Sequence, residues 1–348
     1  MSRTTPARPL DVAALFPRLA PLARTATRLH PHPGSPSPHD SSVGGPLLWP
    51  ADEPWPHCDG PHVWDRVNPA LSPEDVRQRR RIRAAVASRP SGIPEMERYT
   101  PEERAIDQRI AAGRPWPDGP VPMLPVAQLY VRDVPQLRPP RAVNADLLQV
   151  LWCPFDHPAH PRTALYWRSA AEVTDVLAAP PEPSAIQFPG YLPRPCLLTP
   201  EQITEYPNLL ELDEEDQQQL GEWQSWQPAG PAVDRSYQSA PEEFYMDQVS
   251  HAPGWKVGGW TRWGLTDPVD RVCEVCASAM DPLLTIASAE WDPSSESWIP
   301  EEDRARSIQT PADPQPWNPT MLDLARGYDL QLHVCPVSPD HRHLELVQ

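Results

Sequence analysis

The stretch LQVLWCPFDH at residues 148–157 returns late in the chain as LQLHVCP at residues 330–336, followed by the pair Asp340-His341. Each copy is an apolar run typical of a strand, and each continues through Cys-Pro to an Asp-His pair. Self-similarity between distant segments is typical of proteins built from repeats. The echo therefore predicts that the chain consists of two related halves.

Two further echoes stand ahead of the first one in each half. The stretch VGGPLLW at residues 43–49 matches VGGWTRW at residues 257–263, and an acidic residue, a proline and a cysteine follow both. Paired glycines suit a bend or a close approach of two backbones. The strand-like run PVAQLY at residues 125–130 corresponds to PLLTIA at residues 282–287. Because all three landmarks keep their order, we expect an α+β fold: a strand-rich internal duplication of two similar repeats with helical insertions.

These landmarks divide the chain into four expected parts. They are an N-terminal helix and linker at 1–41, repeat 1 at 42–160, connecting helices and a Pro-rich linker at 161–250, and repeat 2 at 251–348. Spaced leucines predict that the N-terminal helix covers residues 9–29, with kinks at its prolines.

Helix-start signals locate the insertion in repeat 1 at about residues 63–121. Ser72-Pro73 and Thr100-Pro101 each place a capping residue before a proline, with an acid two residues later. The same signal at Thr199-Pro200 predicts a short helix in the connecting part. The first helix of the insertion, at 72–89, is rich in arginine, which favours a solvated surface over an anion or RNA contact.

Composition narrows the class of protein. The chain of 348 residues contains 51 prolines, which favour short elements joined by stiff loops, while 14 tryptophans supply the buried surface that disordered chains lack. A net charge of −17 disfavours nucleic acid and favours a basic protein or peptide partner. Neither a secretory signal nor an apolar run long enough for a bilayer is evident, so we expect no membrane contact and a cytoplasmic location. The oligomeric state is left open.

Cysteine and histidine residues recur at the landmarks. Cys273 and Cys276 form a C-x-x-C pair without the βαβ setting of a redox motif, which favours zinc instead. Zinc needs four thiolate or imidazole ligands, and the closing landmark offers Cys335 with His341, or His343 as an alternate. We predict a structural zinc site from Cys273, Cys276, Cys335 and His341.

The first half offers a weaker second site at the equivalent positions. Cys58 and Cys153 are each followed four residues later by a histidine, His62 and His157, with His57 or His160 in reserve. The alternative for both sites is that the cysteines are small core residues and the histidines bond to their own loops. A closed site with four protein ligands would hold loops together and would not itself catalyse.

Catalytic motifs are weak by comparison. Adjacent residues such as Asp156-His157 and Asp340-His341 point to opposite sides of a strand, so they do not predict a dyad. The paired glycines lack the longer pattern of a phosphate-binding loop. We therefore predict no catalytic residue and no organic cofactor.

Tryptophans cluster around the landmarks and are candidates for partner contacts. Tryptophan is enriched in binding hot spots, so a groove between the repeats lined by Trp49, Trp55, Trp260 and Trp263 is a candidate docking surface. The alternative is an aromatic core.

At these landmarks the chain resembles the YwqG-like family of bacterial domains of unknown function. The resemblance rests on the VGG-x-x-x-W openings, Gln128-Leu129, the stretch from Pro282 to Asp292 and the closing DLQLHVCP at 329–336. It implies a strand-rich duplicated α+β fold and a distant similarity to eukaryotic ribosome-maturation factors of the programmed-cell-death/Tsr type, which chaperone a ribosomal protein. Some members resemble immunity components of toxin systems. The resemblance implies no catalytic residue.

The sequence is compatible with two functional hypotheses. The leading hypothesis is a non-enzymatic protein-binding module, chaperone-like or immunity-like, that holds a basic partner. The alternative is a metal-dependent hydrolase or RNA-processing enzyme that uses the Cys/His clusters.

Overall fold

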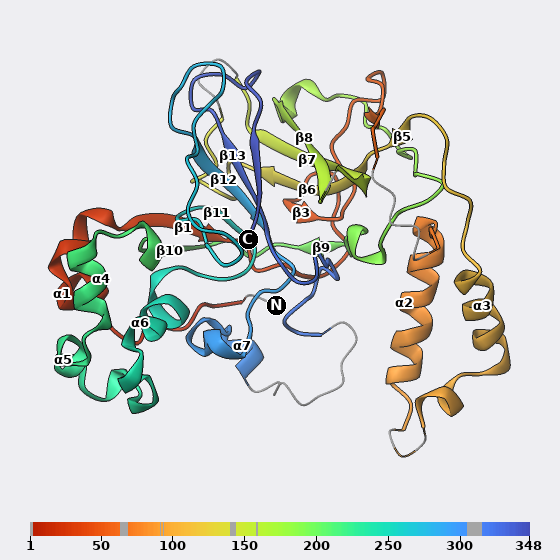
Figure 1. The fold of residues 1–348 in the computed structure, drawn as a ribbon. Coiled ribbons are helices and arrows are strands. Elements are labelled where there is room, and N and C mark those ends of the chain that lie inside the picture. Colours follow the sequence, from red (N-terminus) through yellow and green to blue (C-terminus); the bar gives the residue numbers. More distant parts are fainter. Residues whose placement is uncertain are drawn as a thin grey trace.

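Two six-stranded antiparallel sheets form the centre of the molecule, and helices lie to either side of them (Figure 1). The structure is a computed structural model, and it describes residues 3–62, 69–90, 92, 94–139, 144–157, 159–304 and 315–348. Every pair of named strands is antiparallel, which confirms the α+β expectation.

The first sheet contains four strands from residues 32–156 and two strands from the connecting part. Its order is β2 (His32–Pro33), β9 (Cys196–Leu197), β3 (Ser42–Val43), β6 (Leu124–Tyr130), β7 (Leu147–Asp156) and β8 (Pro161–Arg168). A two-stranded ribbon of β4 (His57–Cys58) and β5 (Val121–Pro122) accompanies it.

The second sheet is built mainly from the end of the chain. Its order is β10 (Glu201–Glu205), β1 (Arg24–Arg28), β11 (Lys256–Gly258), β12 (Asp281–Ile286), β13 (Leu330–Val334) and β14 (Leu344–Val347). Four successive strands of the second half, β11 to β14, therefore follow the same order as β3, β6, β7 and β8.

The matching strands also share local details. The register shifts between Pro125 and Ala127 in β6 and between Pro282 and Leu284 in β12, at the proline that opens each run. Proline cannot donate to the ladder, which is one reason why it is found at such irregularities.

In both halves, a buried glutamine donates a hydrogen bond to the backbone of the VGG-x-x-x-W stretch. Gln149 of β7 donates to the carbonyl of Leu48 at 2.9 Å, and Gln331 of β13 donates to the carbonyl of Arg262 at 2.8 Å. Leu48 and Arg262 occupy the same position, directly before the tryptophan of the VGG-x-x-x-W stretch. The buried glutamine amides thus satisfy equivalent backbone groups in the two halves.

Two segments, residues 24–33 and 196–205, contribute a strand to each sheet. Parts of both were predicted to be helical. Residues 24–28, expected to be helical, form β1, and Glu201–Glu205, where Thr199-Pro200 predicted a helix, forms β10. These strands pair with each other from Arg24↔Glu205 to Arg28↔Glu201, while β2 and β9 continue the pairing in the other sheet. Pairing across the fold overrides the local helix signals.

Only a short N-terminal helix precedes β1. It comprises α1 (Val12–Leu15) and a 3-10 turn (Pro17–Leu22), so the predicted helix over 9–29 is right for its first part only. Pro17 starts the turn, because proline is tolerated where no backbone donor is needed.

The predicted helices of the insertion are confirmed for the described residues, although 63–68, 91 and 93 lie outside them. They are α2 (Pro73–Ala87) and α3 (Pro101–Ala111), each opened by a capping box. On the opposite side of the sheets lie α4 (Glu214–Gly221), α5 (Trp223–Trp226) and α6 (Pro241–Phe244), with a π-helical turn (Tyr245–Ser250) after α6 (Figure 1). A short α7 (Glu301–Arg304) lies near the lower edge of the sheets.

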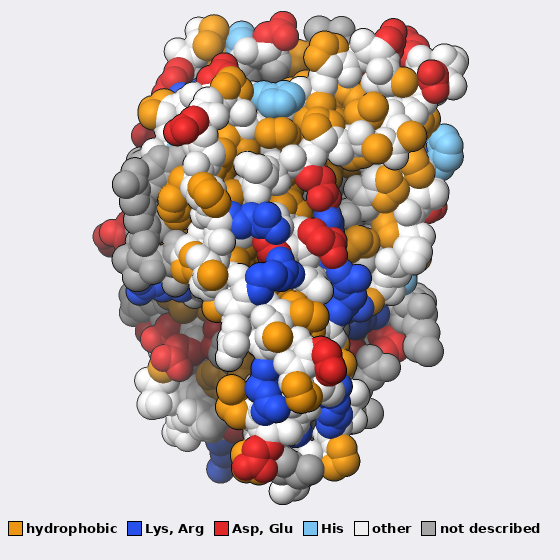
Figure 2. Space-filling view, turned by 90° about the vertical axis from the view of Figure 1, so that its right-hand side faces the viewer, with side chains coloured by type: hydrophobic (Ala, Val, Ile, Leu, Met, Phe, Trp, Pro, Cys, Tyr) orange, Lys and Arg blue, Asp and Glu red, His pale blue; other side chains and the backbone are white. Residues whose placement is uncertain are grey.

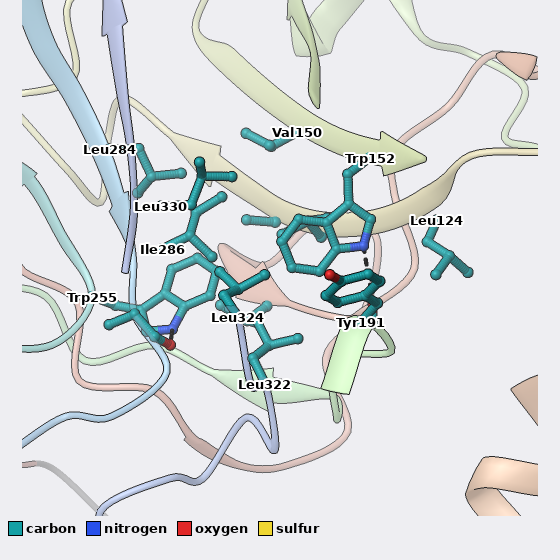
Figure 3. Close-up of a cluster of buried hydrophobic side chains, with 14 of the residues drawn as sticks. Leu124, Val150, Trp152, Tyr191, Trp255, Leu284, Ile286, Leu322, Leu324 and Leu330 are labelled. Atoms are coloured by element: carbon teal, nitrogen blue, oxygen red, sulfur yellow. Dashed lines mark hydrogen bonds between the residues drawn. The ribbon is translucent and has the colours of Figure 1, made fainter. Parts of the chain in front are cut away.

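Apolar side chains from both sheets meet in one core. Trp152 of β7 and Trp255, just before β11, contribute their indoles to it, and leucines from the C-terminal region fill the space between (Figure 3). Each indole N–H is satisfied: Trp152 donates to the Tyr191 carbonyl at 2.9 Å and Trp255 to the Ala287 carbonyl at 3.0 Å. Burial of each such side chain contributes on the order of 2 kcal/mol, so the two sheets are held together mainly by this core.

A buried ion pair explains the second of the paired glycines, Gly259. Lys256 and Glu205 are both almost fully buried, with Lys256 Nζ 2.8 Å from each carboxylate oxygen. Gly259 has a φ of +76°, and a Cβ there would lie 2.2 Å from Glu205 Oε2. No side chain fits between the loop and this carboxylate, so glycine is required.

Candidate metal centres

Cys58, His62, Cys153 and His157 converge in the first half, as the sequence predicted. One ligand atom from each side chain lies within 4.8 Å of every other, and Cys58 Sγ is 3.4 Å from His157 Nε2. Both thiols are buried, and the two imidazoles are partly buried. We call these four residues group 1.

Group 1 is assembled by strands. Cys58 ends β4, and a turn through Gly60, at a φ of +88°, returns the chain toward His62. Cys153 lies in the part of β7 where the pairing with β8 is irregular, and His157 follows the end of that strand. The irregularity interrupts regular pairing close to the other ligands, as β-bulges beside functional sites often do.

The environment of group 1 favours one thiolate and a neutral His157. A hydrogen bond from Cys153 lowers the pKa of Cys58 to about 4, with further lowering by the backbone amide of Gly60 and by His62. The pKa of Cys153 is raised in return, by its bond to Cys58 and by burial. Burial lowers the pKa of His157, which keeps its ring available as a ligand.

Cys273, Cys276, Cys335 and His341 converge in the second half, again as predicted. Their ligand atoms also lie within 4.8 Å of one another. His341 Nδ1 is 3.4 Å from Cys273 Sγ and 3.2 Å from Cys335 Sγ, and the sulfurs of Cys276 and Cys335 are 3.4 Å apart. We call these residues group 2.

Group 2 is assembled by loops rather than strands. Cys273 and Cys276 lie in a turn between β11 and β12, in which the Ala277 amide donates to the Cys273 carbonyl at 2.8 Å. Ala277 has a φ of +56°, a left-handed conformation that costs a residue with a Cβ about 1 kcal/mol. Cys335 follows β13 and His341 lies in the loop before β14.

The two groups contain five cysteines. In four of these, the sulfur accepts a hydrogen bond from the backbone amide two residues later in the chain. The amides of Gly60, Phe155, Ser278 and Val337 hydrogen-bond to Cys58, Cys153, Cys276 and Cys335 in that order. Hydrogen bonds of this kind favour a thiolate. Bonds from Ser278 lower the pKa of Cys276 to about 6, while burial raises that of Cys335.

Four distances between ligand atoms, one in group 1 and three in group 2, are close to those of a tetrahedral site. Ligand atoms 2.0–2.3 Å from a shared zinc ion lie about 3.3–3.8 Å from one another. The separations of 3.2–3.4 Å between ligand atoms are close to that range. The 3.4 Å between the sulfurs of Cys276 and Cys335 is far too long for a disulfide, whose sulfurs lie about 2.05 Å apart. All six cysteines are free thiols. Both groups are therefore compatible with zinc.

The reserve histidines have other partners. His57 Nδ1 bonds to the Trp55 carbonyl, and His160 Nδ1 to the Pro161 carbonyl. His343 Nε2 is 2.6 Å from the hydroxyl of Thr163 and near Glu345. His62, His157 and His341, which the sequence predicts as ligands, are the histidines that lie among the cysteines.

Three of the four tryptophans proposed for partner contacts are buried. Trp49, Trp55 and Trp263 are 1%, 7% and 5% exposed, so these indoles are core residues and offer a partner almost no surface. Trp260 is half-buried beneath Arg24, whose guanidinium lies 3.5 Å from the ring centre. Composition and spacing alone cannot separate a core tryptophan from a surface one.

Asp156 and Asp340, the aspartates beside the histidines, make described hydrogen bonds with residues other than those histidines. Asp156 accepts hydrogen bonds from the Tyr191 hydroxyl at 2.5 Å and from the Gln187 amide at 2.9 Å, which ties the end of β7 to the following segment. The amide of Asp340 bonds to Ser338. Both contacts are structural, in agreement with the sequence argument.

Comparison of the sequence with family models and with curated proteins does not assign the chain to a family. No family model matches the chain, and no curated protein matches it at a significant level. Among the described helices, none combines the length and apolar character needed to cross a bilayer.

Proposed function

We propose that this protein is a non-enzymatic binding module whose loops are fixed by two structural zinc ions, one in each Cys/His group. The observation that carries the proposal is the ligand count: each group brings four protein ligands within 4.8 Å. Catalytic zinc sites keep three protein ligands and leave the fourth position to water or substrate. Four protein ligands favour a closed, structural site over the hydrolase alternative.

We also propose that the two groups descend from one ancestral unit by duplication, as the YwqG-like resemblance implies. In support, each group joins the loop before the second matching strand to the end of the third. The shared strand order and the Gln149 and Gln331 contacts point the same way. Buried thiols without disulfides suit a reducing compartment, and we place the protein in the cytoplasm.

The partner that we propose is a basic protein or peptide, bound at the helices α4 to α6. Residues 201–250 contain 12 acidic residues and a single basic one, Arg235. Glu214 and Glu215 open α4 on the exposed surface. Among the described residues, Arg18 is the one cation that pairs with the acids at this helix start. A surface of this charge attracts a basic partner and speeds its association.

Metal content tests the structural part of the proposal. Elemental analysis of the full-length protein, purified without chelator, should find about two zinc ions per chain. Cys196→Ser is the matched control, since this buried cysteine lies outside both groups. A protein with normal stability and no bound metal would show that the cysteines are core residues only.

Co-purification from the native host tests the partner. A basic protein should be recovered in stoichiometric amount and lost with Glu214→Lys, because the charge reversal repels it. Glu102→Lys, at the exposed start of α3 on the opposite side, is the matched control. Recovery of an acidic partner, or equal loss with both variants, would contradict the proposal.

A further inference from the structure

A cavity of about 420 Å³ lies between α2 and the segment that leads into β9. Its charged residues are Arg77, Arg80 and Arg81 of α2, Arg194 from the other wall, and Glu74. The space-filling view of this side shows Lys and Arg side chains gathered over the middle and lower part of the face, with hydrophobic side chains between them (Figure 2). In a chain with a net charge of −17, this concentration of positive charge is a local exception.

Tertiary contacts hold the arginines in place. Arg80 donates to the backbone carbonyls of Pro189 at 2.9 Å and Met321 at 3.1 Å, which ties α2 to two distant segments. These contacts fix α2 against the segment of Met321, which also lines the cavity. Arg194 lies opposite and is half-buried, in a loop anchored by its own amide bond to the Thr320 carbonyl at 2.7 Å.

The acids that touch these arginines are exchangeable. Arg77 pairs with Glu182, and Arg81 with Glu74, but Arg77 and Arg81 remain 43% and 67% exposed in their side chains. Exposed ion pairs of this kind contribute at most about 1 kcal/mol. A carboxylate from a partner, bound in the two-pronged geometry that arginine favours, can therefore replace them.

The remaining walls are apolar and not aromatic. Leu192, Met321 and two prolines line the cavity together with Ala84, and none of the described lining residues is aromatic. Single strands of nucleic acid are held by stacking on aromatic side chains, and a long phosphate chain would meet the negative charge of the rest of the surface. A short segment that alternates carboxylates with an apolar side chain fits both the walls and the charge.

We propose that this arginine-lined cavity binds an acidic, partly apolar peptide segment of a partner protein. The site is separate from the acidic helices α4 to α6, which lie on the other side of the sheets. The protein would then bind two partners, or two parts of one partner, of opposite charge.

Fluorescence anisotropy with the full-length protein tests the site. The probe is a short labelled peptide with glutamates on both sides of a leucine, and the comparison peptide has glutamine in place of glutamate. Arg194→Glu should weaken binding of the glutamate peptide by about tenfold or more, because a charge-assisted hydrogen bond is lost and repulsion is added. Arg83→Glu, an equal charge change on α2 outside the cavity lining, should alter it by less than about twofold.

Four results would overturn the proposal. Equal losses with Arg194→Glu and Arg83→Glu would indicate a general charge effect, and equal binding of the two peptides would exclude a role for carboxylates. Displacement of the peptide by a single-stranded RNA at lower concentration would assign the face to nucleic acid. Self-association that Arg194→Glu abolishes, measured by sedimentation, would assign it to the acidic helices of a second copy. If Arg194→Glu does not fold, Arg194→Gln serves in the same assay, with a loss of about threefold expected.

Discussion

Groups 1 and 2 contain similar ligands in very different surroundings. Cys58 and Cys153 of group 1 belong to an aromatic core with Trp49, Trp55 and Phe155. In the described part of the chain, the apolar cluster around group 2 contains only Met280 and Leu344 besides the cysteines, and Cys276 is partly exposed. A metal in group 1 would add to a core that other side chains already stabilise, whereas in group 2 it would be the main connection between two loops. The same ligand pattern can therefore carry a small or a large share of the local stability.

Removal of metal should reveal this difference most strongly. A strong chelator should lower the free energy of unfolding by several kcal/mol, since structural zinc contributes directly to folding. Hydrogen exchange should then rise in residues 264–280 and 335–343, which surround group 2, and much less in β4 and β7. Equal loss of protection around both groups, or none, would contradict the comparison.

Serine substitutions separate the role of a ligand from that of a core residue. Cys153→Ser and Cys276→Ser should each release one of the two proposed zinc ions. With chelator present, Cys153→Ser should still cost about 1–3 kcal/mol, because it places a hydroxyl in a site that is 0% exposed. Cys276→Ser should then cost almost nothing. The measurement is thermal unfolding with and without chelator, and similar costs for both in the metal-free protein would remove the distinction.

Two histidines near the end of the chain provide a narrower test of group 2. His341→Ala should release the group 2 metal, because its Nδ1 lies among the sulfurs. His343→Ala should retain both metal ions and cost on the order of 1 kcal/mol, since it loses only the bond to Thr163 and the contact with Glu345. Elemental analysis of the two variants measures the metal content. Loss of metal from His343→Ala alone would show that His343, and not His341, is the ligand.

The smallest expected effect concerns the turn of group 2. Ala277→Gly should raise stability by up to about 1 kcal/mol, because glycine adopts a φ of +56° without strain. Ala112→Gly, at the end of α3 where φ is −66°, should lower it instead. Denaturant unfolding of the two variants measures both changes, and destabilisation by Ala277→Gly would argue against strain in this turn.

Both ligand sets could be predicted from the sequence because their positions depend on short-range chemistry and on the order of the echoes. Cys58 and His62, for instance, need only a turn between them, and Gly60 allows that turn. The strands β1 and β10 could not be predicted in the same way. Their pairing joins residues about 180 positions apart, while the spaced leucines of residues 9–29 and the Thr199-Pro200 start signal favour helices. The tryptophans were likewise ambiguous, since burial depends on what packs against each ring.

By itself, the sequence determined the α+β class, the repeated landmarks and the eight candidate ligands, because each depends on residue types at short spacing. Only the tertiary structure decided which histidines join the cysteines, which tryptophans are buried, and how Arg194 comes to face Arg80 across a cavity. These features depend on contacts between segments far apart in the chain. The free energy of such contacts arises only when the whole core is formed, so no local pattern records it.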